Sequence, residues 1–267
     1  MALIKTQEEI KKILEGCKIT GEILEKLYKM VKPGMSTWEV DQAAEKMICD
    51  AGGRPAFKGY KSHPDDYPFP TTICASINDG LVHGIAKKTD ILKEGDIFTI
   101  DIGMEWPYKK GERGYYTDTA YTVAVGKISK ENDKLLQVTQ QSLEEAIKVA
   151  IPGNSVADIG RAVENYTKSQ GKYGIIRDLV GHGVGHAVHE DPRIPNYYDP
   201  KLEKIKLKPG MVLAIEPMTA IGDWRVKTGK DGWTIVMADG SMCAHFEHTI
   251  IITETGNIVA TRRPSEK

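Results

Sequence analysis

Apolar residues in the N-terminal part of the chain recur at intervals of three and four, the spacing of one helix face. Thr6 and Glu9 have the spacing of a capping box, in which two side chains satisfy free backbone N–H groups at a helix start. Ser36 and Glu39 repeat this signal before a second apolar series. The pattern predicts two consecutive helices, over 6–31 and 36–49.

The pattern then changes from helical to strand-like. Residues 56–70 are rich in aromatic side chains and proline, which indicates a loop whose rings, Tyr60, Tyr67 and Phe69, are available to line a cavity. Over residues 97–102 the side chains alternate between two faces, as they do in a β-strand.

The second half of the chain repeats the features of the first half in the same order. Three pairs of segments match: 31–36 with 150–155, 92–101 with 207–216, and His83-Gly84 with His182-Gly183. We therefore expect an α+β fold of two pseudo-symmetric halves, about 1–130 and 131–267, with antiparallel strands packed under helices. Because no Ser/Gly-rich linker separates the halves, we expect one domain over 1–267.

Composition excludes several classes of protein. The 36 Lys and Arg residues balance 37 Asp and Glu residues, so a nucleic-acid or anionic-membrane partner is not expected. No apolar run approaches the roughly 20 residues of a membrane helix, and the N-terminus lacks the apolar core of a signal peptide. The four cysteines form no CxxC pair, which favours free thiols in a reducing cytoplasm.

Four carboxylates interrupt apolar strand segments: Asp101, Asp118, Glu216 and Glu247. Each alone could equally be a solvent-facing position, but Asp101 and Glu216 occupy matching places in the duplicated segments. A buried carboxylate is costly unless it is paired, and these strand segments contain no Lys or Arg. Metal ions are the expected partners, and four carboxylates carry enough charge for two divalent ions.

A glycine-rich segment, 181–190, contains three histidines. Its glycines disfavour a helix, so the spacing of His182 and His186 does not indicate a zinc-binding helix. In an extended chain these two side chains share a face and His189 points the other way. One histidine could then bind a metal ion while another contacts substrate, and we expect His186 to be structural.

Other polar and aromatic positions have simpler explanations. We expect His63 on the surface and residues 109–114 in a solvated hairpin loop. His245 and His248 flank Glu247, and packing or support of a metal ligand is more plausible for them than direct ligation. Trp233 is more often a core or turn aromatic than a binding residue.

Six segments together carry a specific resemblance: 77–84, 99–101, 117–119, 181–186 with 189–190, 214–218 and 246–249. In this order they resemble the type I class of methionine aminopeptidases, in the pita-bread family of dinuclear metallopeptidases, over essentially the whole chain. The resemblance implies a pita-bread fold and removal of N-terminal methionine, with a preference for a small second residue.

The resemblance also implies the ligands of two divalent metal ions. Asp118 and Glu247 would bridge the ions, Asp101 would chelate one of them, and His182 with Glu216 would complete the other. Co, Mn, Fe and Zn all suit such a site, and the sequence does not choose among them. A hydroxide shared by the two ions would be the nucleophile.

Substrate contacts follow from the same resemblance. His189 would contact the substrate carbonyl oxygen, His83 the scissile amide nitrogen or the next residue, and Glu216 would transfer a proton to the leaving amine. The implied methionine pocket consists of Tyr60, Phe69, Cys74 and Trp233. The implied partners are N-termini of nascent polypeptides, with transient ribosome association, for a cytoplasmic monomer without membrane or nucleic-acid specificity.

Three departures from the family pattern concern the rim and shape of the pocket. Asp101 and Asp118 lie 17 residues apart, which lengthens the hairpin between them, and the 61–68 loop is enlarged. Val188 stands where many relatives have a bulky aromatic residue.

Two other functions remain as alternatives. Prolidases and Xaa-Pro aminopeptidases use the same ligands on the same fold, usually with a large additional N-terminal domain. A binding module that has lost its metal site usually shows ligand substitutions, and here all five positions keep ligand-competent side chains.

Overall fold

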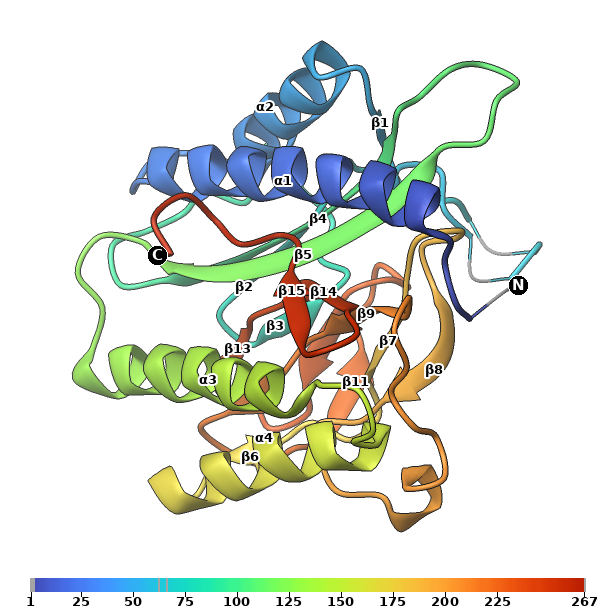
Figure 1. Cartoon of the computed structure of the whole chain (residues 1–267). Coiled ribbons are helices and arrows are strands. Elements are labelled where there is room, and N and C mark those ends of the chain that lie inside the picture. The colour runs from blue at the N-terminus through green and yellow to red at the C-terminus, as the bar shows by residue number, and fades with distance from the viewer. Residues whose placement is uncertain (1–2, 62, 66, 267) are drawn as a thin grey trace.

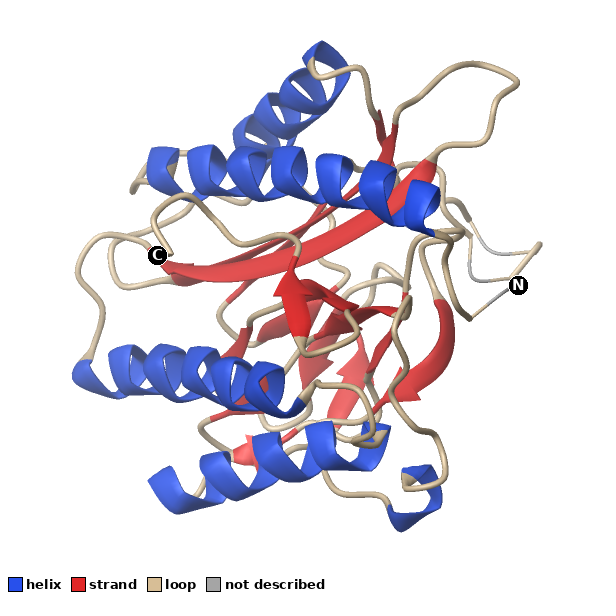
Figure 2. Ribbon diagram, viewed as in Figure 1, coloured by secondary structure: helices blue, strands red, loops and turns tan. Residues whose placement is uncertain are grey.

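The computed structural model describes residues 3–61, 63–65 and 67–266. Two helices, α1 (Gln7–Met30) and α2 (Thr37–Asp50), lie on one side of the strands. Two more, α3 (Lys130–Val149) and α4 (Val156–Gln170), lie on the opposite side (Figure 1). Figure 2 shows this layering, with the strands between the two pairs of helices. The predicted α+β class is confirmed.

Within the described residues, the strands pair in antiparallel fashion. The first-half sheet contains β1 (Arg54–Pro55), β2 (Ile73–Ile77), β4 (Ile97–Trp106) and β5 (Tyr115–Ala124). The second-half sheet has the order β15 (Asn257–Val259), β14 (His248–Ile252), β9 (Val212–Ile215), β7 (Gly181–Gly183), β8 (Glu190–Ile194).

Two smaller sheets complete the strand layer. One has the order β13 (Cys243–His245), β10 (Met218–Ala220), β6 (Gly174–Ile175). The other has the order β11 (Val226–Thr228), β12 (Ile235–Met237), β3 (Gly80–Val82), so it joins a strand of the first half to a hairpin of the second. A short 3-10 helix, η1 (Pro200–Leu202), follows β8.

The first two helices begin where their capping boxes predict. In each box the cap hydroxyl accepts from the backbone N–H of a glutamate, and that glutamate accepts from the cap backbone N–H: Thr6 with Glu9, and Ser36 with Glu39. Each observed helix ends within one residue of its expected boundary. Local hydrogen bonding therefore sets these boundaries.

The duplication seen in the sequence extends to backbone hydrogen bonds. The Gly34 N–H donates to the Leu92 carbonyl over 2.8 Å, and the matching Gly153 N–H donates to the Leu207 carbonyl over 3.0 Å. Each bond links two turns of its half. One turn precedes the second helix, and the other precedes a central strand. The predicted pseudo-symmetry of the halves is thus visible in equivalent turns.

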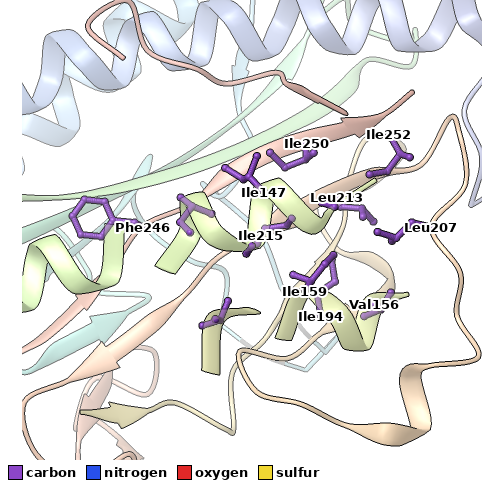
Figure 3. Packing of buried hydrophobic residues seen from close by; sticks show 14 of the residues in the cluster. Ile147, Val156, Ile159, Ile194, Leu207, Leu213, Ile215, Phe246, Ile250 and Ile252 are labelled. Carbon is purple, nitrogen blue, oxygen red and sulfur yellow. The ribbon is translucent and has the colours of Figure 1, made fainter. Parts of the chain in front are cut away.

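The core of the second half lies between its helices and its sheet. Figure 3 shows Ile147 and Ile159, from α3 and α4, beside Leu213 and Ile215 of β9 and Ile250 of β14. Burial of each such side chain contributes about 1.5–3 kcal/mol to folding. This packing fixes β9, and therefore the position of the residue that follows its last isoleucine.

A seam of hydrogen bonds joins β5 to residues 247–249, where β14 begins. The Glu247 N–H donates to the Ala120 carbonyl over 3.0 Å, and the Thr119 hydroxyl donates to the Glu247 carbonyl over 2.8 Å. The Thr249 hydroxyl donates to the Asp118 carbonyl over 2.7 Å. The seam holds two of the predicted ligand residues, one from each half, in fixed relation.

In the part of the chain that the structure describes, the helices lack the length and apolar content required for a transmembrane span.

Candidate active site

One cavity of about 600 Å³ is lined by all five residues expected to bind metal. Asp101 lies on β4, Asp118 on β5 and His182 on β7. Glu216 follows the last residue of β9, and Glu247 lies between β13 and β14. Residues far apart in the sequence, from both halves, therefore meet at one place.

The candidate ligand atoms lie close enough to share an ion. One ligand atom from each of Asp118, His182 and Glu247 lies within 4.8 Å of the others. The Nε2 atom of His182 is also 3.5 Å from Oε1 of Glu216 and 3.9 Å from Oδ2 of Asp118. These separations are longer than hydrogen bonds and are compatible with two atoms that bind the same ion.

Burial dominates the electrostatics of the cluster. It raises the pKa of Asp101 to about 7, and burial together with neighbouring carboxylates raises the pKa of Asp118, Glu216 and Glu247 well above the usual range. Burial, with a contribution from His189, lowers the pKa of His182 to about 3, so its imidazole is neutral and has a lone pair for a metal.

Three buried carboxylate oxygens support the presence of cations. Oδ1 of Asp101, Oδ1 of Asp118 and Oε1 of Glu247 have no hydrogen-bond partner among the described residues. An isolated buried carboxylate is costly, and oxygen ligands with one imidazole suit divalent transition metals. The donor set therefore fits the divalent ions that the sequence predicts.

The histidine segment folds differently from the sequence-based expectation. His182 and His189 do not face opposite ways, because their ring centroids are 4.5 Å apart. Instead, β7 ends one residue after His182, and Gly185 turns the chain with φ of +126°. His186 points elsewhere: its Nε2 lies 2.8 Å from Oε1 of Glu9, at the start of α1, in line with its expected structural role.

Two further histidines border the cavity. The Tyr60 hydroxyl lies 2.9 Å from Nδ1 of His189, and burial lowers the pKa of that imidazole. If the tyrosine donates to Nδ1, the proton of the neutral ring is on Nε2, where it can be donated to a ligand. Burial and the nearby His189 lower the pKa of His83 to about 4, and its φ of +56° is an uncommon backbone conformation that is found more often at functional sites.

An apolar subsite adjoins the acidic cluster. Its members pack together in one cluster: Phe57, Tyr60, Phe69, Cys74, Val188 and Trp233. The four predicted pocket residues are therefore brought together. Trp233 contacts Phe69 edge-to-face, with ring centroids 5.3 Å apart, and lines the cavity, so it is more than a turn aromatic. Phe57 was not predicted as a pocket residue, although it lies in the expected aromatic loop, whereas Tyr67 is 87% exposed.

Most of the remaining expectations also hold. His63 is exposed, and the 109–114 segment lies in the loop between β4 and β5. His248 is buried against Thr261 and Arg263, which fits packing rather than ligation. In the enlarged 61–68 loop, residues 62 and 66 lie outside the described residues.

A buried ion pair that the sequence pattern does not predict holds the histidine segment. Lys5 Nζ is 2.5 Å from Oε2 of Glu190, and the two side chains are 1% and 5% exposed. The other oxygen of Glu190 accepts from the backbone N–H groups of His186 and Ala187. The N-terminal arm thereby braces the loop that carries His189.

Lys5→Met is expected to lower the free energy of unfolding by about 3–5 kcal/mol, because it leaves a buried carboxylate unpaired. Urea denaturation measures this change. Lys46→Met is the matched control, since the Lys46–Asp50 pair is 74% and 64% exposed and its loss should cost less than about 1 kcal/mol. Equal, small effects of the two substitutions would show that the pair does not brace the fold.

Comparisons with known proteins agree on one family. Residues 11–254 match the model of metallopeptidase family M24. Methionine aminopeptidase 1 of Bacillus subtilis is 45% identical over 262 residues, covering 98% of this chain and all of the relative. The crystal structure of methionine aminopeptidase from Thermotoga maritima has a TM-score of 0.90 and 41% identity, covering 98% of this chain and 100% of that one.

A more distant structure shares only the fold. The prolidase from Pyrococcus horikoshii has a TM-score of 0.74 and 23% identity, covering 98% of this chain and 64% of that one. The expected pita-bread architecture, common to both kinds of peptidase, is confirmed.

Proposed function

The chain belongs to metallopeptidase family M24, and from this premise we propose that it is a methionine aminopeptidase that removes N-terminal methionine from peptides and nascent proteins. One observation carries the proposal: a buried cluster of four carboxylates and one histidine adjoins an apolar subsite of aromatic rings and a thiol. An unbranched thioether suits such a subsite. We also propose a preference for a small second residue.

Five residues would hold two divalent ions: Asp101, Asp118, His182, Glu216 and Glu247. When bound, such ions lower the pKa of water and polarise a carbonyl group. Co, Mn, Fe and Zn are all compatible with this donor set.

The protein's own side chains orient the substrate and move its protons. His189 would donate from Nε2 to the carbonyl oxygen of the first peptide bond, where negative charge develops. Glu216, whose pKa is raised by burial, would accept a proton and deliver it to the leaving amine. His83, which also lines the cavity, would contact the scissile amide or the following residue.

We also propose the cellular setting that the family resemblance implies. The chain would act as a single catalytic domain, because both halves would contribute ligands, and as a monomer. It would meet its substrates in the cytoplasm, in transient contact with ribosomes. Analytical ultracentrifugation tests the monomer, and co-sedimentation with ribosomes tests the contact.

Peptide hydrolysis by metal-stripped protein, with and without added Mn²⁺ or Co²⁺, tests the proposed activity. We expect metal-dependent release of methionine from Met-Ala-Ser and none from Met-Trp-Ser, Leu-Ala-Ser or Ala-Pro. Cleavage of Ala-Pro instead would assign the chain to the proline-specific branch. Metal binding without any turnover would favour the binding-module alternative.

A further inference from the structure

His245 is a buried histidine held rigidly at the edge of the acidic cluster. His245 is the last residue of strand β13 and is 1% exposed. Its backbone N–H donates to the Thr122 hydroxyl over 3.0 Å, and its carbonyl accepts from the same hydroxyl over 2.8 Å. Met218 of β10 pairs with it on the other side. The backbone is therefore fixed on both sides, which restricts where the ring can point.

The ring points at two carboxylates but forms no hydrogen bond with either. Its Nε2 lies 3.5 Å from Oε2 of Glu216 and 3.9 Å from Oε2 of Glu247. Within the described ranges, neither ring nitrogen of His245 has a hydrogen-bond partner. An unpaired buried polar group is unfavourable, so a small adjustment that pairs Nε2 with a carboxylate would be favourable.

Glu216 lies between two imidazoles that approach it with similar geometry. Its Oε1 is 3.5 Å from Nε2 of His182, and its Oε2 is 3.5 Å from Nε2 of His245. Nε2 of His182 lies 3.9 Å from Oδ2 of Asp118 and belongs to the group of ligand atoms within 4.8 Å of one another. Nε2 of His245 approaches Glu216 and Glu247 instead. The two histidines therefore have different surroundings: one lies within the proposed ligand group, and the other lies against Oε2 of Glu216.

We propose that His245 is a positioning residue, whose Nε2–H donates to Oε2 of Glu216 and turns Oε1 toward the metal-binding cluster. The inference rests on the proposed metal site. Carboxylates that bind metals are commonly oriented by hydrogen bonds of this kind, and loss of such a partner costs 10–100-fold in affinity or activity. A fixed Glu216 also keeps its reactive oxygen in place for proton transfer.

Two substitutions by amide side chains of different length test the proposal. In His245→Gln the side-chain nitrogen is separated from Cβ by as many bonds as Nε2 of histidine, so it can donate to Glu216. In His245→Asn it is one methylene short. Calorimetric titration of the metal-stripped proteins with Mn²⁺ should show wild-type affinity, within about threefold, for His245→Gln, and a 10–100-fold loss for His245→Asn. His186→Leu removes a buried imidazole remote from Glu216 and should bind Mn²⁺ like the wild type.

Visible absorption of the Co²⁺-loaded proteins supplies a second measurement, because the spectrum reports the atoms bound to the ion. A positioning role leaves the spectrum of His245→Gln unchanged. If both amide variants lose affinity and their spectra shift, His245 is itself a ligand and the proposal is wrong. If neither loses affinity, the ring only fills space and the proposal is equally wrong. None of these outcomes depends on turnover, so a failure of the proposed peptidase activity remains distinguishable.

Discussion

Asp118→Asn is expected to abolish metal-dependent peptidase activity and yet to make the metal-stripped protein more stable. Asp118 is 3% exposed, and burial, together with nearby Glu247 and Asp101, raises its pKa. Without cations this charge is repelled by its neighbours, so a neutral amide of similar shape removes an unfavourable interaction. With cations the lost charge weakens the site. Because metal ions contribute several kcal/mol to catalysis, kcat/KM for Met-Ala-Ser should fall by at least about 10³-fold.

The stability gain should depend on pH in a defined direction. A carboxyl group whose pKa is raised in the folded state does not reduce the free energy of unfolding at pH values below its unfolded pKa. The free energy of unfolding falls as the pH rises from the unfolded pKa through the folded pKa. For Asp101 this window runs from its ordinary value of 3.8 to about 7. Burial raises the pKa of Asp118 in the same direction, so the gain from Asp118→Asn should be larger at pH 7.5 than at pH 4.5.

Thermal melting of the metal-stripped proteins at both pH values, with calorimetry of Mn²⁺ binding, measures these effects. Asp50→Asn is the control, because Asp50 is exposed and its substitution should change neither quantity appreciably. A variant at Asp118 that bound Mn²⁺ and hydrolysed Met-Ala-Ser like the wild type would remove Asp118 from the metal site.

The helix starts were predictable because their signals are local. Thr6 and Glu9 are three residues apart, and a hydrogen-bonding pattern that short needs no knowledge of the rest of the fold. The strand that carries Asp101 was predictable in position from its alternation. It is buried along almost its whole length rather than on one face, because other elements cover it, and alternation alone does not reveal that.

The convergence of the carboxylates was predictable because the two halves of the sequence contain matching segments in the same order. Asp101 and Glu216 end matching segments, and a two-fold relation between the halves brings matching positions together. Burial without a cationic partner then indicated a metal site, and the unpaired oxygens of the cluster agree with that reasoning.

Contacts between distant segments could not be predicted in this way. Lys5 and Glu190 are separated by 185 positions, and no periodic pattern relates them. The turn at Gly185 also has no signal in strand alternation, which is why the directions of His182 and His189 were predicted wrongly. A glycine permits such a turn without requiring it.

His189→Ala is expected to lower kcat for Met-Ala-Ser by about 10²–10³-fold, the usual effect of removing one donor to a developing oxyanion. Binding of Mn²⁺ should be unchanged, because His189 is not among the proposed ligands and contacts the proposed ligand His182 through its ring. Steady-state kinetics at saturating Mn²⁺, with calorimetry of metal binding, separates these quantities. A variant that lost Mn²⁺ in proportion to activity would place His189 among the ligands instead.

Tyr60→Phe tests whether the Tyr60 hydroxyl keeps the proton of His189 on Nε2, from which it can be donated to the substrate. The Tyr60 hydroxyl lies 2.9 Å from Nδ1, and its loss allows the neutral ring to carry its proton there, which leaves Nε2 without one. We expect a smaller loss of kcat, about tenfold, and no further loss when Tyr60→Phe is added to His189→Ala, because both changes act through one proton. Additive losses in the double variant would mean that Tyr60 acts on the substrate directly, as part of the apolar subsite. The comparison therefore decides whether this tyrosine recognises methionine or positions the histidine.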